Sequence, residues 1–412
     1  MKLDVDEAKL LSEIEALAAI SDAEPPVVTR IVFTPADLKA RAWLKTRCEG
    51  AGLSVRQDPI GNTFVRWIGS DPTLPAVGTG SHIDAIPHAG KYDGVVGVLG
   101  GLEAIRALRR AAFQPTHSIE LLVFTAEEPT RFGIGCLGSR MLSGSLSADA
   151  ARQLKDREAA PLDEVRKRAG MAGELEAVKL PSAYYKAFVE LHIEQGPVLE
   201  RDQIPLGVVT SIAGPASLQI FIEGSGGHAG GVLMPARHDA LCAASELVLA
   251  IENAARSSGA IDTVATVGIC EVFPGAINSI PSRVRLGVDI RDTDLERRNR
   301  VRWKMETAGR EIAEKRHVSV RNELVNADAP AVCAPLVVEA LSESCRKHNL
   351  NFLPMVSRAY HDSLFMSHIV PTAMLFIPCR NGYSHRPDEY ASPQEIARGT
   401  LVLAETLAAL SQ

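Results

Sequence analysis

The stretch LPAVGTGSHIDAIPHAGKYDGVVGVLGGLEAIRALRR, residues 74–110, decides the fold class. It begins with an apolar run that ends in small residues, a pattern typical of a buried strand that runs into a loop. The apolar residues then recur with helical spacing from Gly94 to Arg110. The inward face of this helix would consist of Val95, Val98, Leu99, Leu102, Ile105 and Leu108. A strand, a polar loop and a helix in this order indicate an α/β domain.

The same pattern recurs on both sides of this stretch. SIELLVFTAEE, residues 118–128, is again an apolar strand followed by an acidic loop. Helical periods cover the N-terminus and residues 35–50 and 334–348, and strand patterns cover residues 54–68 and 372–377. Because polar residues follow the carboxyl ends of the strands, we expect the functional site at that edge of the sheet.

The pattern changes between about residues 216 and 325. The expected elements are, in order, a strand at 217–223, a helix at 235–255, strands at 263–273 and 282–291, a helix at 294–314 and a strand at 317–324. This β-α-β-β-α-β order is that of a ferredoxin-like α+β domain. We therefore predict one α/β domain, made of residues 1–212 and 327–412, interrupted by an inserted domain at residues 213–326.

Composition and charge disfavour some partners. The net charge of -6 and a pI near 6.0 leave no electrostatic footprint for nucleic acid or an anionic membrane. No stretch is long and apolar enough for a membrane span, and the N-terminus resembles an amphipathic helix, not a secretion signal. The 7 cysteines are scattered, which favours a reducing compartment. We expect a soluble cytoplasmic protein without nucleic-acid or membrane partners.

Residues that suit a pair of divalent ions lie in loops after the predicted strands: His82, Asp93, Glu128, His192 and His385. One such histidine alone is more often a hydrogen-bonded structural residue, whereas five such positions together favour a dinuclear centre. Asp93 is our choice for the carboxylate that bridges the ions, because a loop before a glycine-started helix can approach both closely.

Two further carboxylates have predicted roles beside the ligands. We expect Asp84 to accept the other ring N–H of His82 and so to set its tautomer. Glu127 precedes Glu128, and one of the pair can bind metal while its neighbour acts as general base on the attacking water. Glu127 is the predicted base, which would then pass the proton to the leaving nitrogen.

The segments GSHIDAIPHAGKYDGVVGVLGG, FTAEEPTRFGIGCLGSRMLSG, ELHIEQGPVLE and GHAGGVLMPARHDA resemble signatures of the aminoacylase/carboxypeptidase superfamily of dinuclear metallohydrolases. Within it, the chain is similar to the group of N-carbamoyl amino acid, allantoate and ureidoglycolate amidohydrolases, over nearly its whole length. The resemblance implies a dinuclear metallopeptidase-like α/β catalytic domain with an inserted ferredoxin-like lid and dimerisation domain, in a homodimer.

The resemblance also implies the ligand sets. His82, Asp93 and His192 would hold one ion, and Asp93, Glu128 and His385 the other. His192 is informative, because exopeptidase relatives usually have a carboxylate there and the carbamoyl-cleaving group has histidine. Manganese ranks first as the metal, and zinc also fits these ligands.

Four substrate contacts follow from the resemblance. Arg291 corresponds to a clamp for the substrate carboxylate, although such an arginine alone is more often part of a surface ion pair. Gln195 and Asn278 correspond to amide contacts. His228 corresponds to a histidine that enters the active site from the partner subunit and stabilises the tetrahedral oxyanion.

The segment SRAYHDS, residues 357–363, departs from the Gly-Ala-Gly-His-Asp type run of carbamoylases and allantoate amidohydrolases. With LFIPCRNGYSHRPDEYAS, it is most similar to ureidoglycolate amidohydrolases. Tyr360 and His361 would line the pocket, and the bulky tyrosine would make it smaller. The predicted reaction is hydrolysis of ureidoglycolate to glyoxylate, ammonia and carbon dioxide.

Other substrates and another class of protein are the alternatives. An N-carbamoyl-L-amino acid is the second candidate substrate and allantoate the third, since pockets discriminate by only about 1–3 kcal/mol per methylene. A non-catalytic binding protein with this fold would lack a metal ligand or the base, and none is missing.

Overall fold

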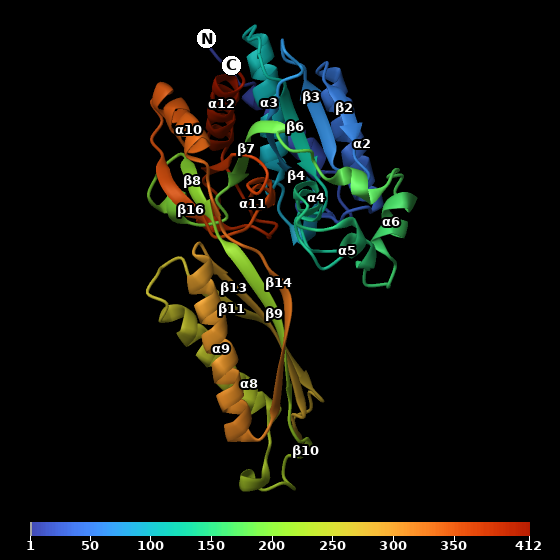
Figure 1. The fold of residues 1–412 in the computed structure, drawn as a ribbon, viewed down its shortest axis with the longest axis vertical. Coiled ribbons are helices and arrows are strands. Elements are labelled where there is room, and N and C mark those ends of the chain that lie inside the picture. Colours follow the sequence, from blue (N-terminus) through green and yellow to red (C-terminus); the bar gives the residue numbers. More distant parts are fainter. Residues whose placement is uncertain (1) are drawn as a thin grey trace. The chain divides into compact units, whose positions relative to one another are not determined.

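The computed structural model of the protein describes residues 2–412 and contains two compact units (Figure 1). The first unit comprises the chain up to Thr210 together with Val332–Met355 and His361–Gln412. The second comprises Ser211–Ala331 and Val356–Tyr360. The short segment Val356–Tyr360 thus clusters with the second unit, whereas the sequence pattern had placed it in the α/β domain.

The first unit is built on a 9-stranded mixed sheet. Its strands in spatial order are β15 (Ala331–Val332), β8 (Gly207–Ile212), β17 (Thr372–Ile377), β7 (Tyr185–Ile193), β4 (Ala76–His82), β6 (Ile119–Phe124), β3 (Thr63–Trp67) and β2 (Ser54–Gln57), with β16 (Leu353–Ser357) paired to β8. The central strands β17, β7, β4 and β6 run parallel. Every residue of β4, β6 and β17 is buried, as expected for parallel strands covered on both faces.

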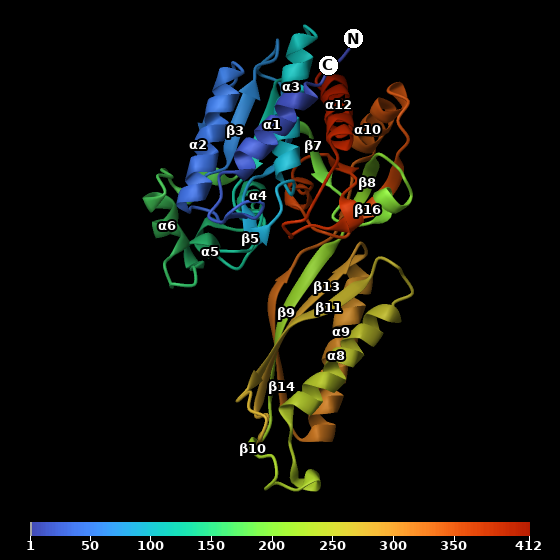
Figure 2. The same cartoon turned by 180° about the vertical axis from the view of Figure 1, so that it is seen from behind.

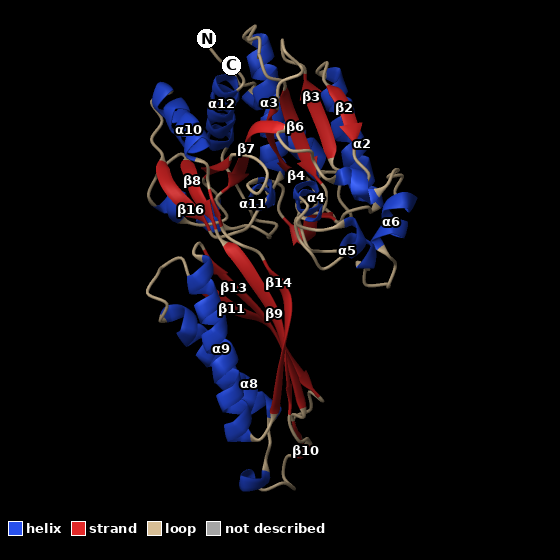
Figure 3. Ribbon diagram, in the orientation of Figure 1, coloured by secondary structure: helices blue, strands red, loops and turns tan. Residues whose placement is uncertain are grey.

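Helices pack around this sheet (Figure 3). They are α1 (Glu7–Ala18), α2 (Pro35–Gly50), α3 (Val95–Arg110), α4 (Leu137–Ser143), α5 (Ala148–Gln153), α6 (Leu162–Arg168), α7 (Val198–Arg201), α10 (Pro335–Lys347), α11 (Asp362–Met366) and α12 (Pro393–Leu410), with short 3-10 turns η1 (Leu175–Val178) and η3 (Arg380–Gly382). The predicted helix at 94–110 is confirmed, with Gly94 as its N-cap. It contacts α1 and α12 as well as the sheet, which explains its burial from Val95 to Leu108 (Figure 2).

A small ribbon lies outside the main sheet. The strands β1 (Val28–Arg30) and β5 (Ala85–Ala89) pair antiparallel and join the N-terminal segment to the loop after β4. The buried guanidinium of Arg30 donates to the carbonyl oxygens of Ile20, Leu17 and Ile83. Ile83 lies between His82 and Asp84, so this ribbon holds the backbone of a loop that carries predicted site residues.

The second unit has the predicted β-α-β-β-α-β order. Its elements are β9 (Gly214–Glu223), α8 (Ala240–Arg256), β11 (Val264–Phe273), β13 (Arg283–Asp292), α9 (Leu295–Arg316) and β14 (Ser319–Ala327), with the short β10 (Gly227–His228), β12 (Ser279–Ile280) and η2 (Met234–Ala236). The sheet order is β11-β13-β9-β14, all antiparallel, and α8 and α9 pack on it. Helix α8 begins later than predicted, because the Asp239 side chain accepts the N–H groups of Leu241 and Cys242.

Among residues 2–412, no helix combines the length and the apolar character needed to cross a bilayer.

Candidate metal centre

The predicted ligands of the first unit converge at one edge of the sheet. The parallel strand β4 ends at His82, Glu127 and Glu128 follow β6, His192 lies near the end of β7, and His385 follows β17. Parallel strands bring their carboxyl ends to the same edge, so these side chains meet although they are far apart in the chain.

Asp93 lies at the centre of this group. Its Oδ1 is 3.4 Å from Nε2 of His82 and 3.3 Å from Nε2 of His192. Its Oδ2 is 3.4 Å from Nε2 of His385, and the same nitrogen is 3.3 Å from Oε1 of Glu128. One carboxylate oxygen therefore faces one pair of ligands and the other oxygen faces the second pair.

These separations fit ligands that share an ion. Two atoms each about 2.1 Å from a tetrahedral ion lie about 3.4 Å apart, which matches these separations. His82, Asp93 and His192 form one group whose ligand atoms can meet at an ion, and Asp93, Glu128 and His385 form another. Both groups contain Asp93, so the donor set fits the bridged pair predicted from the sequence.

The loop of Asp93 approaches the ligands closely. Gly94 has a positive φ of 66°, and a Cβ at this position would lie 2.5 Å from Nε2 of His82. The N–H of Gly94 also lies 3.1 Å from Nε2 of His192. Only glycine combines this backbone conformation with the required space, which explains the glycine at the start of α3.

The ring orientation of two histidines suits metal binding. Nδ1 of His82 lies 3.0 Å from the carbonyl oxygen of Asp84, and Nδ1 of His192 lies 3.0 Å from the carbonyl oxygen of Ile193. A proton on Nδ1 is donated to each carbonyl, so the lone pair of Nε2 faces the centre, where an ion would take the place of the Gly94 N–H at His192.

The predicted contact of Asp84 uses a different atom from the one expected. Its carboxylate lies 3.7 Å from Nδ1 of His82, and the backbone carbonyl makes the closer contact. The carboxylate instead accepts the N–H groups of Glu127 at 3.3 Å and Glu128 at 3.1 Å. Asp84 therefore orients the Glu127–Glu128 loop through its side chain and His82 through its main chain.

Glu127, the predicted base, is buried beside the ligands. Its Oε2 lies 3.8 Å from Nε2 of His82, and its Oε1 accepts from the Cys136 thiol at 3.4 Å. Burial raises the pKa of Glu127 well above its ordinary value, the charges of Glu128 and Asp362 add to this, and His82 opposes it. A carboxylate with a raised pKa is a stronger proton acceptor than one free in water.

The pKa values of Asp93 and His385 are also shifted by their close neighbours in the site. Burial raises the pKa of Asp93, but hydrogen bonds from His192, His385 and His82 outweigh it and hold the pKa well below its usual range. Hydrogen bonds to Asp93 and Glu128 raise the pKa of His385 to about 11. A divalent ion can replace imidazole protons in such an arrangement, because a ligating imidazole must be neutral.

Gln195 and His361 also lie at this centre. Nε2 of Gln195 donates to Oδ2 of Asp93 at 2.7 Å, and its Oε1 is buried without a hydrogen-bond partner among the described residues. The His361 ring is buried, with its centroid 4.5 Å from that of His192. Gln195 thus contacts the central carboxylate as well as having an oxygen free for a ligand.

The predicted substrate residues of the second unit form two separate groups. The guanidinium of Arg291 lies 5.6 Å from the centroid of the Tyr360 ring and pairs with Asp289 at 2.7 Å. His228 pairs in register with Ser279, and the carbonyl oxygen of Asn278 accepts the N–H of Ala229 at 2.9 Å.

The strand β13 separates these groups. Arg291 lies near its end, whereas Asn278 precedes its start. β13 has 10 residues, and at about 3.3 Å per residue it spans roughly 30 Å. One small molecule cannot touch Arg291 and His228 of the same chain.

Several buried polar residues of the site were missed in the sequence. Glu190 accepts from the hydroxyls of Ser81 at 2.8 Å and Ser363 at 2.6 Å, and Asp362 accepts from Ser139 at 2.5 Å. Glu190 lies within an apolar strand, and Asp362 directly follows His361. These two positions in the sequence were the available signals that both carboxylates belong to the site.

Glu389 and Ser384 were missed as well. Glu389 accepts the N–H groups of Tyr92 and Asp93, and Ser384 contacts both Asp93 and Glu389. Both lie in the segment quoted for its resemblance, within a few residues of His385, which was the available signal.

Comparisons with known proteins give the family of the chain and its similar relatives. The sequence model of the Peptidase family M20/M25/M40 matches residues 78–409. A relative named ureidoglycolate hydrolase from Arabidopsis thaliana is 52% identical over 99% of this chain and 87% of its own length. An N-carbamoyl-L-amino acid amidohydrolase from Geobacillus stearothermophilus is 37% identical over 93% of this chain and 94% of its own. The solved structure of AtUAH in complex with (S)-hydroxyglycine superposes with a TM-score of 0.92 at 51% identity, over 99% of this chain and 98% of that one.

Proposed function

The chain belongs to the Peptidase family M20/M25/M40, and we propose that it hydrolyses the ureido C–N bond of ureidoglycolate. The observation that carries this proposal is the likeness to ureidoglycolate hydrolase along 99% of the chain. The convergence of the ligand groups and Glu127 at one edge of the sheet supports hydrolysis as the chemistry.

We assign two divalent ions to the centre, with manganese ranked before zinc. His82, Asp93 and His192 would hold one ion, and Asp93, Glu128 and His385 the other. When bound, the ions would supply Lewis acidity for the attacking water and the ureido carbonyl.

The residues of the chain then have defined tasks. Glu127 takes a proton from the attacking water as the new C–O bond forms, and gives it to the leaving nitrogen as the C–N bond breaks. The products are carbamic acid, which decomposes to carbon dioxide and ammonia, and hydroxyglycine, which loses ammonia to give glyoxylate. This sequence of steps consumes one water and needs no oxidant.

Several residues of the chain have side chains that can bind a small substrate with a carboxylate group. Arg291 binds the carboxylate, because its fork of N–H donors matches two oxygens. Gln195, Asn278 and His361 make polar contacts, and Tyr360, which lies against Arg291, limits the size of the substrate. His228 donates to the oxyanion of the tetrahedral intermediate.

The substrate assignment predicts a clear order of turnover. Protein freed of metal with a chelator should be inactive, and manganese should restore release of ammonia from ureidoglycolate. N-carbamoyl-L-amino acids and allantoate should be turned over at least about 10-fold less efficiently, because their larger bodies meet Tyr360. The measurement is kcat/KM for the three substrates after loading with manganese or zinc. Equal or higher values for a carbamoyl amino acid would make that compound the substrate, in keeping with the 37% identical relative.

We also propose that the protein is a homodimer through its second unit. His228 and Asn278 lie beyond one end of β13 and Arg291 near the other, so a second copy can supply the His228 group to a site that uses Arg291. The unit also exposes apolar side chains that a partner would cover: Ile269, Phe273, Ile277, Leu233 and Met234.

A mixing experiment tests whether His228 acts in the partner's site. The variants His228→Ala and Glu127→Gln should each be nearly inactive alone. After subunit exchange, half of the dimers are hybrids, and each hybrid contains one site with both residues intact. The mixture should therefore recover about a quarter of wild-type activity, as symmetric pairing requires. Failure to recover activity in a mixture shown to contain hybrid dimers would place His228 in the site of its own chain.

A cytoplasmic location completes the proposal. All cysteines of the chain are free, five of them buried and two exposed, as suits a reducing compartment.

A further inference from the structure

Glu389 contacts two of the three loops that carry the ligand group Asp93, Glu128 and His385. Its side chain is buried, with only 4% of its surface exposed. Oε1 accepts the N–H groups of Tyr92 at 2.8 Å and Asp93 at 3.1 Å, and Oε2 accepts from the Ser384 hydroxyl at 3.0 Å. A single carboxylate thus connects the Asp93 loop with the loop of Ser384 and His385.

Ser384 extends this connection to the carboxylate of Asp93. Its hydroxyl lies within hydrogen-bond distance of Oδ2 of Asp93 as well as of Glu389. The amide of Gln195 donates to the same Oδ2. Because the polar contacts of Ser384 and Gln195 reach Oδ2, the other oxygen of Asp93 is turned toward His82 and His192.

The histidines of the two ligand groups differ in how they are anchored. His82 and His192 lie on strands β4 and β7 and are buried, and each ring is held by a backbone carbonyl at Nδ1. His385 lies in a loop and its side chain is 47% exposed. Its placement depends on its neighbours in the chain, of which Ser384 and Glu389 are tied to the Asp93 loop.

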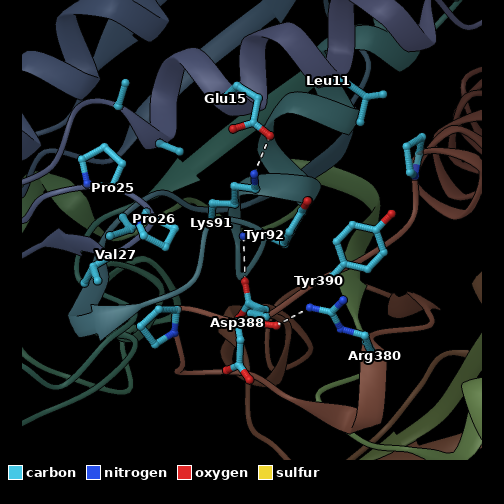
Figure 4. Close-up of a pocket in the computed structure, with 16 residues that line it drawn as sticks. Leu11, Glu15, Pro25, Pro26, Val27, Lys91, Tyr92, Arg380, Asp388 and Tyr390 are labelled. Atoms are coloured by element: carbon cyan, nitrogen blue, oxygen red, sulfur yellow. Dashed lines mark hydrogen bonds and ion pairs between the residues drawn. The ribbon is translucent and has the colours of Figure 1, made fainter.

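The surroundings of Glu389 allow it to be replaced without creating a void in the hydrophobic core. On one side it packs tightly on Gly90, where a Cβ would lie 2.4 Å from the Cβ of Glu389. It also lines a cavity of about 570 Å³. Lys91, Tyr92 and Tyr390 line the same cavity (Figure 4). Truncation would enlarge a cavity that is open to water, which costs less than a void in the close-packed core.

We propose that Glu389 is a positioning residue that holds Asp93 in its bridging orientation and thereby secures the ion bound by Asp93, Glu128 and His385. It acts through the N–H groups of Tyr92 and Asp93 and through the Ser384 hydroxyl, without touching an ion itself. This inference rests on the proposed two-metal centre and goes beyond it by assigning one residue to the occupancy of one ion.

The inference can be tested without an activity assay by titrating the protein with Mn²⁺. The electron paramagnetic resonance signal of free Mn²⁺ then measures how many ions each chain binds and how tightly. The wild-type protein should bind two ions per chain. Glu389→Ala should bind one ion with wild-type affinity and the other about 10–100-fold more weakly, the usual cost of losing a partner behind a metal ligand. The thermal unfolding of the metal-free proteins checks that the variant keeps its fold.

Glu389→Gln is the matched control. Its amide oxygen can accept the same two N–H groups, and its NH₂ can donate to Ser384, which keeps its own proton for Asp93. This variant should bind both ions nearly as the wild type does. Ser384→Ala removes the hydroxyl that links Glu389 to the Asp93 carboxylate but leaves the contacts of Glu389 with the N–H groups of Tyr92 and Asp93 in place. It should weaken the same ion, so it serves if Glu389→Ala does not fold.

Two results would overturn the inference. One is wild-type affinity for both ions in Glu389→Ala or, failing that, in Ser384→Ala. The other is an equal loss in Glu389→Ala and Glu389→Gln, because the effect would then come from the charge and not from the hydrogen bonds. A wild-type protein that binds two ions but leaves ureidoglycolate intact would contradict the proposed substrate and leave the role of Glu389 standing.

Discussion

Asp93→Ala should bind neither ion and should lose all measurable hydrolysis. Asp93 is the one residue common to both ligand groups, with Oδ1 facing His82 and His192 and Oδ2 facing His385. Without it, each group keeps only two protein ligands. Since metal activation contributes several kcal/mol to such reactions, turnover should fall at least about 10³-fold. Metal content after dialysis and ammonia release from ureidoglycolate measure the two effects.

The control for this prediction is Glu128→Ala. Glu128 belongs only to the group with Asp93 and His385, so this variant should lose one ion and keep the other. A bridging role for Asp93 would be refuted if Asp93→Ala still held either ion with wild-type affinity.

Glu127→Gln should abolish turnover while both ions remain bound. Glu127 lies beside the ligands but belongs to neither ligand group, and its raised pKa results chiefly from burial. The amide has nearly the same shape but cannot take a proton from water, so kcat should fall by roughly 10²–10⁴-fold, the usual contribution of a general base. The measurements are kcat with saturating manganese and the number of ions bound per chain.

Glu128, the next residue in the chain, provides the control for this prediction. Glu128→Gln should lose activity together with one ion, whereas Glu127→Gln should lose activity alone. Retention of more than about a tenth of wild-type kcat in Glu127→Gln would remove this residue from the role of base.

Local patterns were sufficient to predict much of the fold. The helix at 94–110 and the strand before it follow from apolar spacing, and the structure contains both as α3 and β4. The β-α-β-β-α-β order of the second unit was also predictable, because each of its elements has a regular alternation or helical period. Residues 137–178 lack a long period, and the short helices α4, α5 and α6 there were not predicted.

The atoms that make the contacts were harder to predict. The sequence places Asp84 two residues from His82, which suggested a bond between their side chains. In the structure the carboxylate of Asp84 is engaged by the N–H groups of Glu127 and Glu128, and its carbonyl contacts the histidine. A loop from another strand thus competes for the carboxylate, and spacing along one chain segment contains no information about that loop.

The residue types at the strand ends are apparent from the amino-acid sequence alone. They predict that His82, Asp93, Glu128, His192 and His385 can meet at one edge of a parallel sheet. Strand ends and ligand types are local properties, so no tertiary information was needed. Three features required the three-dimensional arrangement: each oxygen of Asp93 faces different imidazoles, Glu389 accepts the N–H of Asp93, and β13 separates Arg291 from His228. These depend on how loops and strand ends distant in sequence are placed in space, which residue spacing does not encode.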